Sequence, residues 1–283
     1  MAAIVHSVKL ATGVTLQYVE QGDPAGIAVL LLHGVTDSWH SFESVLAYMP
    51  DSIHAFALTL RGHGDTSRPP TGYRYSDFSA DVAAFMDVTG LESAVLVGHS
   101  MGRAIAQRYA IDQPQRTVGL VLMGAFAGEA GNPVIVEVEE VVSKLTDPLD
   151  PDFVREFQVS TLAQPVPPAF LETIVRESLK VPAWVWRAAF VALREDDVAA
   201  EIGKINVPTL VVTGDRDSFA SISDVEARTR TIAGAQLAVY HGAGHGFHWE
   251  EPARFAGDLA AFTERLRSLE GATSPIARGS KRF

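Results

Sequence analysis

The chain contains no cysteine and is poor in positive charge, with 23 lysine and arginine residues against 34 acidic ones and a formal net charge of −11. Without cysteine it has no disulfide, no thiolate nucleophile and no cysteine-ligated metal cluster. The acidic balance disfavours nucleic acid and anionic lipid as partners, because both carry negatively charged phosphates. The expected partner is therefore a small molecule.

Long apolar runs are also missing. The longest, such as Ile27–Leu32, hold about six residues, whereas a helix that spans a membrane needs about 18. The N-terminus has no apolar segment before a small-residue cleavage site, as a signal peptide would have. We therefore expect a cytoplasmic protein that does not cross a membrane. No Gly-x-Gly-x-x-Gly, Gly-x-x-x-x-Gly-Lys or His-Glu-x-x-His pattern occurs, so we expect no nucleotide cofactor and no metal.

Short apolar runs bounded by glycine alternate with amphipathic stretches, which is typical of an α/β protein with a mostly parallel sheet and helices on both faces. An antiparallel hairpin, formed by Val5–Leu10 and Val14–Val19, is expected at the edge of that sheet. The other expected strands are Ile27–Leu32, Ile53–Leu60, Ala94–Val97, Val118–Met123, Thr209–Thr213 and Leu237–Tyr240.

One interval breaks the alternation. Residues 125–206 contain no convincing strand but several helical stretches, which prolines interrupt. We expect a core domain from residues 1–124 and 207–270, with 125–206 forming a helical cap. Ligands of open α/β sheets bind beyond the carboxyl ends of the strands, where this insertion begins and ends. The tail at 271–283 is rich in Gly, Ser, Pro and basic residues and is expected to be disordered.

The sequence Gly-His-Ser-Met-Gly at residues 98–102 follows an expected strand and leads into a helical pattern. A serine at such a turn takes strained backbone angles and points into a cleft, and the flanking glycines let neighbouring backbone approach closely. The pattern alone is common, but its strand-turn-helix setting favours a catalytic nucleophile over an ordinary turn. Ser100 is therefore the candidate nucleophile.

A serine nucleophile needs a histidine to remove its proton and an acid to orient that histidine. Gly-Asp-Arg-Asp at residues 214–217 follows one buried strand, and Ala-Gly-His-Gly at 243–246 follows the next. Candidate acids are Asp217 and Asp215. The neighbouring His241 and His248 are alternatives to His245 as the base, and a zinc site of the three histidines would need a helix that the intervening glycines disfavour.

These motifs resemble the α/β-hydrolase superfamily, and the resemblance covers about residues 5–268. It also includes Leu-Leu-His-Gly at 31–34, Leu-Arg-Gly-His-Gly at 60–64 and Trp-Glu-Glu-Pro at 249–252. The resemblance implies an α/β-hydrolase fold and a nucleophilic serine. Because the reactions of haloalkane dehalogenases and epoxide hydrolases need a carboxylate nucleophile, serine at position 100 argues against both.

By the same resemblance, Ser100 is the nucleophile, His245 the base and Asp217 the acid. The backbone amides of Val35 and Met101 are the expected oxyanion donors, and such donors each contribute roughly 10²- to 10³-fold to the rate. One departure from the family pattern is Arg103, where many relatives have a second glycine after the turn; it either alters packing below the nucleophile or lines the cleft.

The sequence predicts a cofactor-free serine hydrolase that cleaves a carboxylic ester or lactone of a small to medium apolar substrate. Two alternatives on the same three residues are a perhydrolase, or cofactor-independent haloperoxidase, and a carbon–carbon bond hydrolase. A third is a ligand sensor whose catalysis is vestigial. The expected substrate-binding residues are the large side chains Trp39, Phe126, Trp184, Trp186 and Phe247. Oligomeric state is left open.

Overall fold

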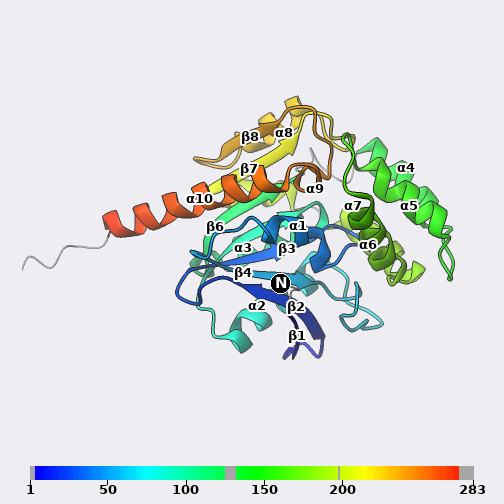
Figure 1. Ribbon diagram of the computed structural model, residues 1–283, viewed down its shortest axis with the longest axis horizontal. Helices are drawn as coiled ribbons and strands as arrows, with labels where there is room; N and C mark the ends of the chain where they lie inside the picture. Colours follow the sequence, from blue (N-terminus) through cyan, green and yellow to red (C-terminus); the bar gives the residue numbers. More distant parts are fainter. Residues whose placement is uncertain (1–3, 125–131, 197, 274–283) are drawn as a thin grey trace, which may run out of the picture.

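The computed structural model describes residues 4–124, 132–196 and 198–273 (Figure 1). Its strands form one sheet in the order β1-β2-β4-β3-β5-β6-β7-β8. The hairpin β1-β2 is antiparallel and β2 runs antiparallel to β4, whereas all other neighbours are parallel. The predicted α/β class is confirmed. The strands are β1 (Val5–Lys9), β2 (Thr15–Gln21), β3 (Ile27–Leu32), β4 (Ile53–Thr59), β5 (Ala94–His99), β6 (Thr117–Met123), β7 (Thr209–Gly214) and β8 (Gln236–Tyr240).

Helices cover both faces of the sheet, which explains why the strands are continuous apolar runs. Along β3, Val29 and Leu31 pack in a cluster with α10, whereas Leu30 and Leu32 pack in a second cluster with α2 and α3. Helix α2 ends at Gly90, whose φ of 73° is the left-handed conformation that glycine adopts readily. The helices outside the β6–β7 interval are α1 (Glu43–Leu46), α2 (Tyr75–Thr89), α3 (Met101–Asp112), α8 (Ile222–Thr229), α9 (Phe247–Glu250) and α10 (Pro252–Thr273), with the 3₁₀ turns η1 (Trp39–Phe42) and η2 (Pro114–Arg116).

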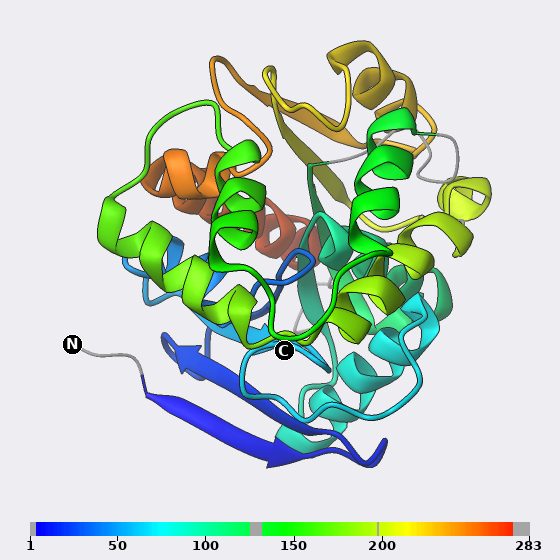
Figure 2. The ribbon, with the colours of Figure 1, turned by 90° about the vertical axis from the view of Figure 1, so that its right-hand side faces the viewer.

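Between β6 and β7 the described residues form helices and no strand, and these helices lie together at one side of the sheet (Figures 1 and 2). Three of the prolines that interrupt this interval in the sequence, Pro133, Pro151 and Pro168, are the first residues of helices, because proline at the first helical position has no amide whose partner would be missing. The four α-helices and the turn that follows them are α4 (Pro133–Val142), α5 (Pro151–Ser160), α6 (Pro168–Leu179), α7 (Ala183–Glu195) and η3 (Ala199–Lys204). We call α4–α7 the cap helices.

The C-terminal helix differs slightly from the expectation. Helix α10 continues to Thr273, whereas the sequence suggested a disordered tail from residue 271, and residues 274–283 lie outside the described residues. Within the described ranges, no helix has both the length and the apolar character needed to cross a bilayer.

Candidate active site

Ser100 is the single residue between strand β5 and helix α3, and its backbone angles are φ 52° and ψ −117°. Positive φ is strained for a residue with a side chain. A Cβ on Gly98 would lie 2.2 Å from the carbonyl oxygen of Gly102, and a Cβ on Gly102 would lie 2.2 Å from that of Leu32. Both glycines are therefore required by close backbone packing, which holds the serine at the carboxyl end of the sheet.

His245 and Asp217 form a buried pair at the same end of the sheet. Nδ1 of His245 lies 2.8 Å from Oδ2 of Asp217, and their side chains are 5% and 0% exposed. The other carboxylate oxygen, Oδ1, accepts a hydrogen bond of 2.8 Å from the backbone N–H of Phe219. When Nδ1 of the imidazole donates to the carboxylate, Nε2 is left as the proton acceptor. The arrangement therefore provides an oriented base.

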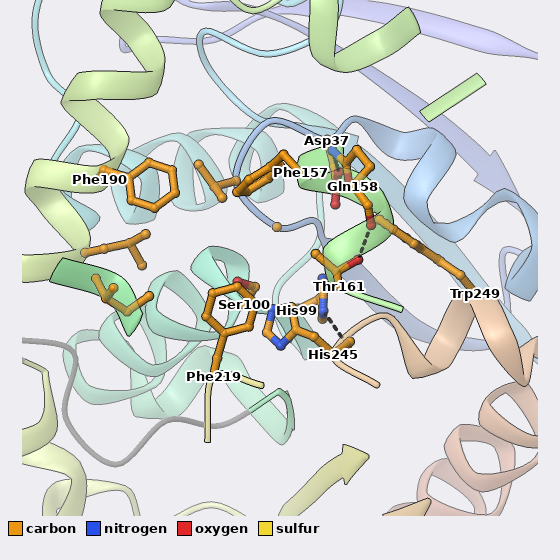
Figure 3. Close-up of a pocket in the computed structure, with 14 residues that line it drawn as sticks. Asp37, His99, Ser100, Phe157, Gln158, Thr161, Phe190, Phe219, His245 and Trp249 are labelled. Atoms are coloured by element: carbon orange, nitrogen blue, oxygen red, sulfur yellow. Dashed lines mark hydrogen bonds between the residues drawn. The ribbon is translucent and has the colours of Figure 1, made fainter. Parts of the chain in front are cut away.

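Ser100 and His245 line the same cavity (Figure 3). About 440 Å³ of space among its lining residues, open solvent included, is free of protein atoms. The loop after β3 closes its floor, since a Cβ on Gly34 would lie only 3.3 Å from Cβ of Ser100. The polar residues of the lining are Asp37, His99, Ser100, Gln158, Thr161 and His245. The large apolar ones are Ile135, Phe157, Phe190, Leu193, Phe219 and Trp249. A hydroxyl, an imidazole and a largely apolar wall thus meet in one space.

The two expected oxyanion donors lie on elements beside Ser100. Val35 lines the cavity, and Met101 is the first residue of α3. Amides of the first helical turn have no partner within the helix and carry its positive end. Both positions suit donors to a developing oxyanion, and that role stays a prediction.

The alternative residues lie elsewhere. Asp215 pairs with His241 at 2.9 Å, but their side chains are 29% and 83% exposed, and neither residue lines the cavity. His248 is buried, with its Nε2 3.2 Å from Oγ of Ser41. The three histidines therefore have three separate partners. In the described part of the chain, no group of three or more His, Asp or Glu side chains is placed to hold a metal ion.

The expected cavity walls need correction, because Trp39, Trp184, Trp186 and Phe247 are absent from the lining. Trp39 is buried and stacks on the neighbouring His40 ring at 3.8 Å between centroids. Trp186 and Phe247 are buried in hydrophobic clusters. The Trp184 ring contacts Tyr73. These side chains serve packing, which requires the same residue types as a cavity wall. Phe126 lies outside the described residues.

Sequence reasoning missed Asp37 and Gln158 in the cavity. Gln158 follows Val154 by four positions on α5, and both side chains are buried. A glutamine on the buried face of an amphipathic helix is a signal that was available in the sequence. Asp37 stands three residues after Gly34 in the His-Gly loop, and its side chain is buried. Arg103, in contrast, is buried below the nucleophile turn and donates to Gln107, outside the cavity lining.

Burial dominates the electrostatics of the site. It raises the pKa of Asp37 to about 7, although hydrogen bonds from Ser41 and Gln158 partly oppose the rise. Burial lowers the pKa of His99 and of His248 well below the ordinary histidine value, and neighbouring histidines add to the effect. Neutral His99 donates from Nε2 to the backbone carbonyl of His245 at 3.1 Å, and so supports the loop that carries the base.

Comparison with known proteins shows the family of the chain. The model of the alpha/beta hydrolase family matches residues 29–259, so the chain belongs to this family. It is 28% identical over 266 residues to the AB hydrolase superfamily protein YisY of Bacillus subtilis, with 91% of this chain and 98% of that protein covered. It is 27% identical over 284 residues to a non-heme chloroperoxidase of Streptomyces lividans, with 91% and 99% covered. The solved structure of the esterase RhEst1 from a Rhodococcus species is similar, with a TM-score of 0.80 and 27% identity over 93% of this chain and 99% of that one.

Proposed function

We propose that this protein is a cofactor-free serine hydrolase that cleaves carboxylic esters, including lactones, through an acyl-enzyme on Ser100. One observation carries the proposal: the buried 2.8 Å pair of His245 and Asp217 lies at a cavity that Ser100 also lines. The strained angles of Ser100 and the similarity to an esterase support it further. Ester hydrolysis needs an activated hydroxyl and no electron transfer, so these residues suffice.

The proposed mechanism follows from their positions. His245 Nε2 accepts the proton of the Ser100 hydroxyl as Oγ attacks the ester carbonyl, and the Val35 and Met101 amides stabilise the oxyanion. The tetrahedral intermediate collapses, and the alcohol leaves with the proton from the imidazolium. Water then attacks the acyl-enzyme with His245 again as base, and the acid is released. Asp217 stays ionised and stabilises the imidazolium.

The cavity favours a modest, mostly apolar acyl group. Its aromatic and aliphatic wall from Phe157, Phe190 and Leu193 gives no partner to a charged chain. The space of about 440 Å³ that is free of protein atoms includes open solvent, so the enclosed part is smaller still. We therefore expect short and medium acyl chains to react faster than long ones.

A panel of para-nitrophenyl esters of increasing acyl length, with several lactones alongside, tests the proposal. We expect an optimum at short to medium chains. The Ser100→Ala variant should lose on the order of 10⁶ in turnover, since the nucleophile is removed. Ser223→Ala, which changes an exposed serine, is the matched control. Unchanged turnover in Ser100→Ala would exclude the acyl-enzyme.

A second candidate is peracid formation, which the similarity to a non-heme chloroperoxidase favours. In this reaction hydrogen peroxide replaces water at the same acyl-enzyme, so the site residues keep their roles. Comparing peracid formation from acetate and hydrogen peroxide with ester hydrolysis at equal enzyme concentration separates the two. We expect hydrolysis to be faster, and a reversed order would favour the second candidate.

A further inference from the structure

Two buried polar side chains of the cavity lining, Asp37 and Gln158, lie apart from Phe190 of α7. In Figure 3, Phe157 lies between Phe190 and these two residues, and Ser100 lies below them. Asp37 is 3% exposed and Gln158 is 1% exposed. The mechanism proposed above uses neither side chain. A buried carboxyl in a largely apolar cavity is costly, and that cost calls for a partner.

The hydrogen bonds that the Asp37 carboxyl receives leave room for another donor. Ser41 Oγ donates to Oδ2 at 3.3 Å, Gln158 Nε2 donates to Oδ1 at 3.3 Å, and the backbone of Gly34 contributes a third hydrogen bond. Both side-chain contacts are long for a carboxylate, which can accept about four hydrogen bonds. The Gln158 amide has a shorter bond of 2.7 Å to Ser178. In the described ranges, Asp37 forms no ion pair with a lysine or arginine within 4.0 Å. Its carboxylate therefore retains acceptor capacity toward the cavity.

The carboxyl lies close to the nucleophile. If Gly34 carried a Cβ atom, that atom would lie 3.2 Å from Asp37 Oδ2 and 3.3 Å from Ser100 Cβ. Both side chains therefore approach the same position beside Gly34. An acyl group held on Ser100 Oγ therefore places its first carbons, those α and β to the carbonyl, within reach of Asp37.

We propose that Asp37 is a specificity-determining residue that binds a hydroxyl on the α or β carbon of the acyl group, with Gln158 holding the carboxyl in place. The substrate class is thus esters and lactones of 2- or 3-hydroxy acids. This inference rests on the proposed function, since it assumes the acyl-enzyme on Ser100. The substrate hydroxyl donates a hydrogen bond to the Asp37 carboxylate. A plain alkyl chain has no donor and leaves the buried carboxylate without this partner.

Matched ethyl esters test this directly. The pair is ethyl 3-hydroxybutanoate and ethyl 3-methylbutanoate, in which a methyl of similar size replaces the hydroxyl, and ethyl 2-hydroxybutanoate is added for the α position. After normalisation to alkaline hydrolysis, we expect kcat/KM for at least one hydroxy ester to exceed that of the methyl ester at least about tenfold, because the alkyl analogue leaves the buried carboxyl unpaired.

Two variants locate the preference. In Asp37→Leu the ratio should fall toward one, and in Asp37→Asn, which keeps one acceptor oxygen, it should fall less. Asp65→Asn changes an exposed carboxylate that pairs with Lys180 and should keep the wild-type ratio. A wild-type ratio of one or less, or an equal ratio in Asp37→Leu, overturns the inference.

A measurement on the wild type serves if Asp37→Leu does not fold. Burial raises the pKa of Asp37 to about 7, so the carboxylate form prevails near pH 8 and the protonated form, a weaker acceptor, near pH 6. The titratable groups around it are His245, His99 from β5, His248 through Ser41, and Glu177 on the packed α6. Hydrolysis of the hydroxy ester and of the methyl ester depends equally on these groups, so the ratio of their kcat/KM values reports on the hydroxyl contact alone. We expect this ratio to fall as the pH is lowered toward 6. A ratio that does not change would overturn the role of the carboxylate.

The two proposals fail differently. If no ester is hydrolysed, or if hydrolysis persists in Ser100→Ala, the proposed function is wrong. If hydrolysis depends on Ser100 but shows no preference for the hydroxyl, only the role of Asp37 is wrong.

Discussion

The loops after β7 and β8 carry two aspartate–histidine pairs. We call the buried pair the inner pair and the exposed pair the outer pair. The inner pair, Asp217 and His245, is 2.8 Å apart with side chains 0% and 5% exposed. The outer pair, Asp215 and His241, is 2.9 Å apart with side chains 29% and 83% exposed. Distance and chemistry are nearly equal, but surroundings differ. Burial and access to the cavity, and not the contact itself, therefore set the proposed catalytic pair apart from the surface pair.

Local packing explains why only the inner pair is held. A Cβ on Gly124 would lie 2.8 Å from Cε1 of His245, and the Phe219 ring lies 4.6 Å from the His245 ring between centroids. These neighbours exclude water and fix the imidazole. The outer pair is open to solvent, where competing water and salt weaken an ion pair.

The largest expected effect separates the two histidines. His245→Ala should lower kcat on a para-nitrophenyl ester by on the order of 10⁶, because the serine then has no base. His241→Ala should stay within about threefold of the wild type, since exposed pairs contribute little. Steady-state kinetics on both purified variants tests this. Comparable losses in the two would break the distinction between inner and outer pairs.

The two aspartates should differ in the same way, with a smaller loss. Asp217→Asn leaves the imidazole in the wrong tautomer and should lower kcat about 10⁴-fold. Asp215→Asn removes only a surface contact and should keep near wild-type turnover. If Asp215→Asn proved to be the more damaging change, the acid would have been assigned to the wrong carboxylate.

The smallest expected effect concerns stability against pH. Burial lowers the pKa of His99 and His248 well below the ordinary value, so the unfolded chain binds protons that the folded chain does not. Each histidine therefore lowers the free energy of unfolding by up to about 1.4 kcal/mol per pH unit as pH falls below about 6.5.

Denaturant titration at several pH values between 5 and 8 measures this effect. The His248→Gln variant should lose stability less steeply toward low pH than the wild type. Identical slopes in the two proteins would mean that His248 takes up its proton equally well when folded.

Much of the fold could be predicted because its signals are local. The apolar run Ile27–Leu32 is strand β3 with the same ends, and the motif at residues 98–102 carries its own turn. The role of Trp186 could not be predicted, since cores and cavity walls use the same apolar residues and only tertiary packing separates them. The burial of Asp37 could not be predicted, because Gln158 on α5, which hydrogen-bonds to its carboxyl, lies far away in the sequence.

Covalent labelling tests the central claim most directly. Wild-type protein is treated with a fluorophosphonate, and the site of modification is found by mass spectrometry of its peptides. We predict one adduct per chain, on Ser100, which is lost in Ser100→Ala, strongly slowed in His245→Ala and retained in His241→Ala. Folded protein that hydrolyses esters but carries no adduct on Ser100 would contradict the account.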